Sequence, residues 1–420
     1  MSKSVKILFV HHTGANGGAT MSLYYLLEYV RKEYEIVVYF ITDGPAVEFY
    51  KNAGIRCVVD RKLGKLPHCT IENQSLNPFS AKFYHDIKPY LKHYFKLIPS
   101  YFRMKQILAE EKPDIVHLNS SVLISEGLAV KSSNIPLIWH MRDFLEYGTF
   151  KIRYSLLRNI ISNCADIVIA LCQSELDRIN PENKGVIIPN FVNFDKFNYE
   201  SVAKVNLREQ LNVSKESKII AMLGWNTPAK GALTLMSAFI EIKDKHPDSV
   251  LVFFGEGPRQ PDANKLKSLL RTLTGKKSLR IELQKMIDDN ALSSRVFFPG
   301  VIFDIASYIA EVDVIAAPFT EPHFARPILE AGAMKTIVVT SDIDGTREMV
   351  LNGQAGYLAR QGNVSSLAHQ LDIALSVDNK DKIELMYQTT LNTYNSCINA
   401  KDTISLYYYL LNINKNLKLK

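Results

Sequence analysis

The sequence has few cysteines, and none of its apolar runs is long. The five cysteines are scattered without a CxxC pair, which argues against a disulfide framework and predicts idle thiols in a reducing compartment. No stretch reaches the roughly 18 apolar residues that cross a bilayer. The short run 5–10 lacks the length of a signal peptide and predicts a first strand. We expect a cytoplasmic protein, compatible with peripheral attachment to the inner face of the cell membrane.

Charge of either sign is also modest. The formal net charge is +7 over 420 residues, which suits anionic ligands but is far below the charge density of a nucleic-acid binder. We therefore expect no nucleic-acid partner. Hydrophobic residues at 47% and charged residues at 22% are typical of a folded chain, and this length suits two domains of about 150–200 residues.

Short apolar runs alternate twice with longer amphipathic segments, which predicts parallel strands joined by crossover helices. The expected strands are Lys6–Val10, Glu35–Phe40, Cys57–Val59, Ile115–Leu118, Leu137–His140, Ile167–Ala170, Val186–Ile188, Lys218–Met222, Ser249–Phe254, Val296–Pro299, Val314–Ala317 and Ile337–Thr340. Expected helices include Thr20–Lys32, Ser155–Asn163, Gly231–Lys243, Arg326–Met334 and Ser365–Leu375.

The alternation is interrupted at 189–215, a polar and turn-rich stretch that we interpret as an interdomain linker. The predicted fold is therefore α/β, with two Rossmann-like domains at 1–195 and 196–398 and a C-terminal segment at 399–420. The stretches 61–105 and 258–290 exceed ordinary connections, and each is expected to be a functional insertion or a lid.

A glycine-bearing turn follows the first expected strand. Gly14, Gly17 and Gly18 would let the backbone approach a ligand, and the helix after them offers free amides to a phosphate or sugar oxygen. The spacing differs from GxGxxG, so a dinucleotide site is not predicted.

The second half carries a comparable turn. Gly224 follows a strand, and Lys230 and Gly231 stand at a helix entry, where a lysine can reach an anion at the helix terminus. The turn FFGEGP at 253–258 ends the next strand and leaves room for a flat ring.

The stretch TEPHFARPILEAGAM is the most informative part of the chain. Phe324 and Ala325 are expected to present free backbone amides at a helix start, Arg326 a bidentate phosphate fork, and Glu330 a carboxylate one turn later. Together these groups could bind a ribose diphosphate, with the amides and the guanidinium on its phosphates and the carboxylate on its vicinal hydroxyls. The alternative interpretation is a plain Arg–Glu ion pair along the helix.

These segments, in this order, resemble the retaining GT-B glycosyltransferases often called glycosyltransferase family 4. The resemblance rests on GGA at 17–19, PNFVNFDKF at 189–197, the Gly224…Lys230-Gly231 element, FGEGP, EPHFARPILEAGAM at 321–334 and SDIDGTREMV at 341–350. It implies two facing Rossmann-like domains with a cleft between them, the N-terminal one for the acceptor, and a C-terminal helix at 399–420 that returns to the N-terminal domain. It also implies a UDP- or GDP-sugar donor bound mainly by the C-terminal domain, without a cofactor or an essential metal.

Carried over to matching positions, the resemblance assigns Lys230 to the donor phosphates, Glu330 to the ribose hydroxyls and His140 to the surroundings of the transferred sugar. The candidate catalytic residues are then His140, Lys230 and Arg326. The candidate donor-binding residues are Gly17, Gly18, Gly224, Lys230, Glu321, His323, Phe324, Ala325, Arg326 and Glu330.

Two positions depart from the family pattern. Trp225 stands where an arginine is usual, so Arg326 would have to supply that charge. The first glutamate of the paired-glutamate motif, Glu321, comes one residue early and has His323 near it. The sugar end of the site is therefore expected to be unusual.

The expected function is retaining transfer of a hexose to a glycan or lipid-linked acceptor in cell-surface polysaccharide synthesis. The basic, aromatic segment 81–105 could rest on an anionic membrane surface, or pack on its own domain with a solvated basic face. Three alternatives remain open: a sugar-nucleotide epimerase, a non-catalytic binding protein, and a metal-dependent transferase built on Asp342 and Asp344.

Overall fold

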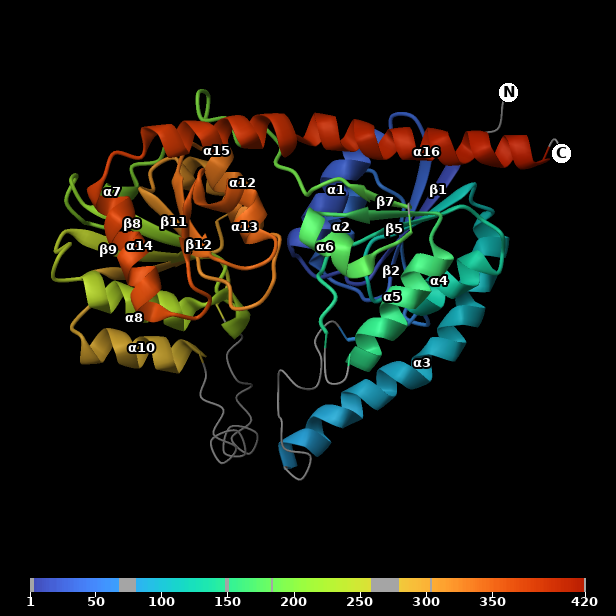
Figure 1. Cartoon of the computed structure of the whole chain (residues 1–420), viewed down its shortest axis with the longest axis horizontal. Coiled ribbons are helices and arrows are strands. Elements are labelled where there is room, and N and C mark those ends of the chain that lie inside the picture. The colour runs from blue at the N-terminus through green and yellow to red at the C-terminus, as the bar shows by residue number, and fades with distance from the viewer. Residues whose placement is uncertain are drawn as a thin grey trace. The chain divides into compact units, whose positions relative to one another are not determined.

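The computed structural model describes residues 4–67, 81–147, 151–182, 184–257, 279–302 and 304–418, with side chains of the helical residues 81–92 and 414–418 left out. The chain divides into two compact units (Figure 1). Unit 1 is Met1–Asn190 with Ser396–Lys420, and unit 2 is Phe191–Asn395. Each unit is a parallel sheet covered by helices, so the predicted α/β class is confirmed.

Unit 1 contains a seven-stranded sheet in the order β3-β2-β1-β4-β5-β6-β7. Its strands are β1 (Lys6–His11), β2 (Glu35–Phe40), β3 (Cys57–Val59), β4 (Ile115–Leu118), β5 (Leu137–His140), β6 (Ile167–Ala170) and β7 (Gly185–Ile187). Its helices are α1 (Gly18–Val30), α2 (Pro45–Asn52), α3 (Ala81–Glu111), α4 (Ile124–Lys131), α5 (Ile152–Cys164), α6 (Gln173–Ile179) and α16 (Ser396–Lys418). All neighbouring strands are parallel.

The core of unit 1 follows from the strand period of two. Leu8 and Val10 point to the face covered by α3, α4 and α5, and belong to a fully buried cluster there. Ile7 and Phe9 alternate with them and are fully buried on the opposite face. The last helix, α16, returns to unit 1 and packs beside α1, as Figure 1 shows.

Unit 2 contains a six-stranded sheet in the order β10-β9-β8-β11-β12-β13. Its strands are β8 (Lys218–Leu223), β9 (Ser249–Phe254), β10 (Val296–Gly300), β11 (Val314–Ala317), β12 (Ile337–Ser341) and β13 (Tyr357–Ala359). Its helices are α7 (Leu207–Gln210), α8 (Ala232–Ile242), α10 (Leu279–Asp289), α11 (Ile305–Ile309), α12 (Arg326–Ala333), α13 (Thr346–Met349), α14 (Val364–Ser376) and α15 (Lys380–Thr393), with short 3-10 turns at Pro228–Lys230 and Leu351–Gly353.

Every strand expected from the sequence is present, with its ends within one residue of the expected ones. The edge strand β13 was not predicted, because its three residues stand between the turn-like stretches QAG and RQG and form no distinct apolar run. Within the expected insertion 61–105, the helical part belongs to α3, the crossover helix that leads into β4. Within 258–290, residues 258–278 lie outside the described part, and almost all of the rest is α10 (Leu279–Asp289).

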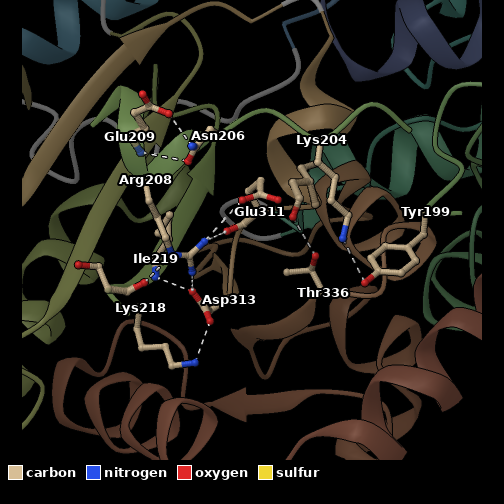
Figure 2. A network of polar contacts seen from close by, with 12 residues as sticks. Tyr199, Lys204, Asn206, Arg208, Glu209, Lys218, Ile219, Glu311, Asp313 and Thr336 are labelled. Atoms are coloured by element: carbon tan, nitrogen blue, oxygen red, sulfur yellow. Dashed lines mark hydrogen bonds and ion pairs between the residues drawn. The ribbon is translucent and has the colours of Figure 1, made fainter. Parts of the chain in front are cut away.

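The expected linker is a folded part of unit 2 from Phe191 onward. Phe191 is buried, and Val192 forms a β-bridge with Asn395. Further along, Arg208 donates from Nη2 to Asp313 Oδ2 at 2.7 Å, and Asp313 also receives the Ile219 amide at 2.9 Å. Figure 2 shows this network, which anchors the segment to the starts of β8 and β11. These strand starts lie at the sheet edge opposite the candidate site.

Candidate functional site

The candidate site lies at the carboxyl edge of the unit 2 sheet, between β8 and β11. The chain leaves β8 toward β9 on one side and later returns to β11 on the other side. Open parallel sheets bind ligands at this kind of topological switch point, because two loops diverge there. The Lys230 loop follows β8, and the Arg326 helix follows β11.

The loop after β8 is shaped around Gly224. This residue has φ +78°, and a Cβ there would lie 2.6 Å from the Lys230 ammonium nitrogen. A side chain would therefore strain the backbone and displace the lysine. The Gly224 amide donates to the Phe254 carbonyl at 2.8 Å, which ties the turn to the end of β9. The absence of a side chain at Gly224 thus leaves room for the Lys230 ammonium group.

The loops after β8 and β11 are interlocked. Gly231 has φ +80°, and a Cβ there would lie 1.9 Å from the Pro318 carbonyl oxygen. The Thr320 amide donates to the Ala229 carbonyl at 2.9 Å. Only glycine fits at position 231, and this close approach fixes Lys230 relative to the segment that leads into α12.

Lys230 lies within electrostatic reach of Glu330, which is paired with Arg326. Arg326 Nη2 lies 3.1 Å from Glu330 Oε1, and the two side chains are only 13% and 14% exposed. Burial lowers the pKa of Lys230 below its usual range, and the nearby Glu330 carboxylate partly offsets the shift. Two cations and one carboxylate therefore share a half-buried space at the start of α12, an arrangement suited to a phosphate and a hydroxyl pair.

The contact between Arg326 and Glu330 is the one expected from the alternative interpretation, an ion pair along the helix. It differs from a solvated surface pair because both groups are largely removed from water. Arg326 Nη1 also lies 3.5 Å from the Phe191 carbonyl oxygen. The guanidinium is thus held by groups of its own unit beside the start of α12.

The segment before α12 differs in part from expectation. The Ala325 amide donates to Met349 Sδ at 3.3 Å, so the expected free amide at Ala325 is wrong. No local pattern indicates this contact, since Met349 lies in the later helix α13. Phe324 is buried against Tyr394, whereas His323 is exposed and stacks on Phe319 with ring centroids 4.4 Å apart.

The two departures from the family pattern have different structural settings. Trp225 is buried in an aromatic cluster with Phe253 and Phe298, at centroid distances of 5.7 Å and 4.9 Å. A Cβ at Gly257 would lie 2.5 Å from the Trp225 ring. The indole therefore fills the core of unit 2. Glu321 is half-buried in the loop that follows β11.

Asp342 and Asp344, the pair considered as a metal site, do not form a cluster of the required size. Asp342 is paired with Arg347, with Oδ1 and Nε 2.5 Å apart. In the described part of the chain, no group of three or more histidine, cysteine, aspartate or glutamate side chains is arranged to hold a metal ion.

In unit 1, Gly17 caps the start of α1 in an extended conformation, and a Cβ there would meet nothing within 4 Å. Gly18 begins the helix. The preceding turn is tight, because a Cβ on Gly14 would lie 2.5 Å from the Thr42 carbonyl. The glycine loop therefore packs closely on the turn after β2 and leaves open space at Gly17.

His140 ends β5 and is buried beside a second histidine. Its Nδ1 lies 3.2 Å from His117 Nε2, and His117 Nδ1 lies 2.7 Å from the Tyr407 hydroxyl on α16. Burial and the charge of Arg142 keep the pKa of His140 well below its usual range, so the imidazole is neutral. Its Nε2 is buried without a hydrogen-bond partner among the described residues.

Sequence reasoning missed a polar network at the carboxyl edge of this sheet. Arg142 Nε donates to Asn119 Oδ1 at 2.8 Å, and the Asn119 amide lies 2.9 Å from His11 Nδ1. His11 Nε2 reaches Thr20 Oγ1 at 3.1 Å, and the Thr20 hydroxyl donates to the Ala15 carbonyl in the glycine loop. Burial lowers the pKa of His11 to about 3. The sequence carries a signal for this network, because polar residues stand at the ends of β1, β4 and β5 or within two residues after them.

The comparisons with known proteins cover both units. Residues 16–196 match the sequence model of "Glycosyltransferase Family 4", and residues 204–383 match that of "Glycosyl transferases group 1". The chain is 26% identical over 293 residues to the UDP-Gal:alpha-D-GlcNAc-diphosphoundecaprenol alpha-1,3-galactosyltransferase of Escherichia coli, an alignment that covers 66% of this chain and 70% of the relative. It is 22% identical to the lipopolysaccharide 1,2-N-acetylglucosaminetransferase of Salmonella typhimurium, covering 65% and 66%.

A solved structure has the same fold over nearly the whole length. The crystal structure of Anabaena Alr3699/HepE in complex with UDP aligns with a TM-score of 0.74 at 19% identity, covering 96% of this chain and 100% of that one. The two family matches follow each other along the chain and meet near the division between the units. The chain therefore belongs to the GT-B glycosyltransferases of the family 4 type.

Proposed function

We propose that this protein transfers a hexose, with retention of configuration, from a UDP- or GDP-sugar to a glycan or lipid-linked acceptor in cell-surface polysaccharide synthesis. The observation that supports the proposal is the largely buried Arg326–Glu330 pair at the switch point of unit 2, with Lys230 within electrostatic reach of Glu330. A nucleoside diphosphate matches this set, because its phosphates need cations and its ribose needs an acceptor pair.

The proposed reaction requires no enzymic nucleophile. The bond between the anomeric carbon and the donor β-phosphate oxygen breaks, and the acceptor hydroxyl attacks the same face of the sugar. The leaving phosphate takes the proton of that hydroxyl. Lys230 and Arg326 stabilise the negative charge that develops on the phosphate, and they do so from a half-buried position where charge is poorly screened.

The other candidate residues have supporting roles in this proposal. Glu330 accepts hydrogen bonds from the ribose hydroxyls, and the open space at Gly17 admits the donor or acceptor beside the start of α1. The neutral His140 stands near the transferred sugar. Because Trp225 lies in the core, no residue at that position supplies phosphate charge, which leaves Lys230 and Arg326 to supply it.

Thermal-shift measurements with UDP-, GDP- and ADP-sugars test the donor assignment, since a ligand that binds the native state raises Tm. One nucleotide class should raise Tm in the wild type and fail to do so in Lys230→Ala. No shift with any of them would favour a non-catalytic binding protein. Conversion of the sugar nucleotide without an acceptor would favour an epimerase, and loss of transfer with a chelator would favour a metal-dependent enzyme.

The proposed acceptor class and membrane contact draw support from two sources. Two relatives carry names that refer to a diphosphoundecaprenol and a lipopolysaccharide acceptor. Helix α3 exposes Phe95, Ile98 and Phe102, at 79%, 71% and 61%, on one side of the helix by their spacing. In the described part of the chain, no helix has the length and apolarity to span a bilayer.

Flotation with anionic phospholipid vesicles tests this contact. The double variant Phe95→Ser/Phe102→Ser should lose most of the vesicle-bound fraction, while Ile281→Ser, a change at an exposed residue of unit 2, should retain it. Equal binding by all three proteins would contradict the membrane proposal and leave the donor assignment intact.

A further inference from the structure

Unit 1 contains a cavity of about 350 Å³ at the carboxyl end of β2. Its walls come from three parts of the chain: the turn at 41–43, the segment 61–65, and the face of α3 that carries His93 and Lys96. The donor residues Lys230, Arg326 and Glu330 all belong to unit 2. None of these donor residues lines the cavity, which belongs to unit 1 together with the glycine loop and His140.

The walls of the cavity are held firmly. Leu63 is fully buried in the core of unit 1. The Gly64 amide donates to Ser100 Oγ on α3 at 2.7 Å, and the Ser100 hydroxyl donates to the buried carboxyl group of Glu126. A Cβ on Gly64 would lie 3.2 Å from the Lys96 carbonyl oxygen. The backbone of this segment is thus bonded closely to α3, which fixes the spacing between the two chain segments that line the cavity.

The lining is rich in positive charge. Arg61, Lys65 and Lys96 line the cavity together with His93, whereas Asp43 is the one acid in the lining. Asp43 is an exposed partner of Arg61, with Oδ2 and Nη2 3.2 Å apart. Lysines from separate segments therefore face a common space with little acidic compensation, a combination that favours a polyvalent anion over a neutral sugar.

Lys65 connects the cavity to the polar network at the sheet edge. It is half-buried, and burial lowers its pKa while Asp143, which follows β5, partly offsets the shift. Its charge also acts on His11, the residue that supports the glycine loop. An anion beside Lys65 would lie within electrostatic reach of the elements that surround the glycine loop and the end of β5.

We propose that this cavity binds the phosphate or diphosphate group of the acceptor, with Lys65 and Lys96 as its principal cations. The inference rests on the proposed function, because it assigns the acceptor's charged group to a site in unit 1. The volume leaves room for a diphosphate and for part of the group attached to it. The same helix, α3, carries the exposed apolar residues Phe95, Ile98 and Phe102, which fits an acceptor whose phosphate is attached to a lipid.

Calorimetric titration with inorganic pyrophosphate tests the site. The titration is done at a saturating concentration of UDP or GDP, whichever nucleotide class raises Tm in the thermal-shift screen, so that the donor site is filled and pyrophosphate reports on another site. We expect saturable binding by the wild type, and binding weakened about tenfold or more by Lys65→Gln and by Lys96→Gln, since each removes a charge-assisted contact. Lys51→Gln, an exposed lysine of α2 outside the lining, should bind as the wild type does.

Titrations with UDP alone and with GDP alone separate this inference from the proposed function. Normal binding of one of these nucleotides together with equal pyrophosphate affinity in all four proteins would overturn the cavity assignment and leave the donor site standing. Absence of binding of both nucleotides would instead count against the proposed function. A final titration uses farnesyl diphosphate. Binding at least as tight as that of pyrophosphate supports a lipid-linked acceptor. Failure to bind farnesyl diphosphate would assign the cavity to a soluble anion and overturn the acceptor assignment.

Discussion

Replacing Lys230 with methionine would remove the ammonium from the proposed phosphate site and keep most of the side-chain volume. The ammonium lies over Gly224 in a half-buried position, and burial already lowers the pKa of this lysine. A cation about 4 Å from a phosphate charge contributes about 4 kcal/mol at an effective dielectric constant near 20. Loss of a comparable transition-state donor lowers turnover by about 10²–10³. We expect a decrease of that size in kcat.

The assay is the release of nucleoside diphosphate from the selected donor, with and without acceptor. Thermal unfolding shows whether the variant is folded, and Lys215→Met, an exposed lysine of the same unit, is the matched control. Arg326 remains to pair with Glu330 in the Lys230 variant, so no buried carboxylate loses its only cation. Turnover within a few-fold of the wild type in a folded Lys230→Met protein would refute the role given to this lysine.

Three further changes probe the packing that supports the site. Gly231→Ala should lower the free energy of unfolding in urea by about 1–3 kcal/mol more than Gly300→Ala does. Both glycines have positive φ, but only Gly231 lies against the Pro318 carbonyl. Equal losses of stability in the two variants would contradict the tight contact between the loops. Tyr407→Phe should cost about 1–3 kcal/mol by leaving buried His117 Nδ1 without its partner, and an unchanged urea midpoint would count against it. Burial raises the pKa of the Glu175 carboxyl group to about 8. Between about pH 4.5 and pH 8 the folded state therefore retains a proton that the unfolded chain releases. The free energy of unfolding of the wild type should fall as the pH rises through this range. The Glu175→Gln variant should lack this pH dependence. If the difference in unfolding free energy between the wild type and the variant is the same at pH 5 and at pH 8.5, the raised pKa of Glu175 is contradicted.

Local patterns in the sequence were enough to predict most of the fold. Apolar runs such as Val314–Ala317 are short and continuous because strands of a parallel sheet are buried on both faces. Turn glycines and Pro327 mark the loops and the start of α12 in the same way. The expected position of Lys230 and Glu330 at one sheet edge followed from the rule that the carboxyl ends of parallel strands lie together.

Other features depended on partners far away in the chain. Trp225 could be recognised as a departure from the family pattern, but its burial against Phe253 and Phe298 depends on the neighbouring strands β9 and β10. The Ala325 amide was expected to be free because Met349, its partner, comes from a later helix. Tyr407 meets His117 across a separation of 290 residues, which no local spacing reports.

The sequence by itself determined the class of fold, the number of sheets, the position of nearly every strand and the loops in which the site residues stand. These follow from periodicity and turn chemistry, which act over a few residues. Only the tertiary structure decided which groups meet: Lys230 with Gly224 and Glu330, His140 with His117, and the lysines of the unit 1 cavity with one another. Such contacts depend on strand order and helix packing, so they are set when the whole chain folds.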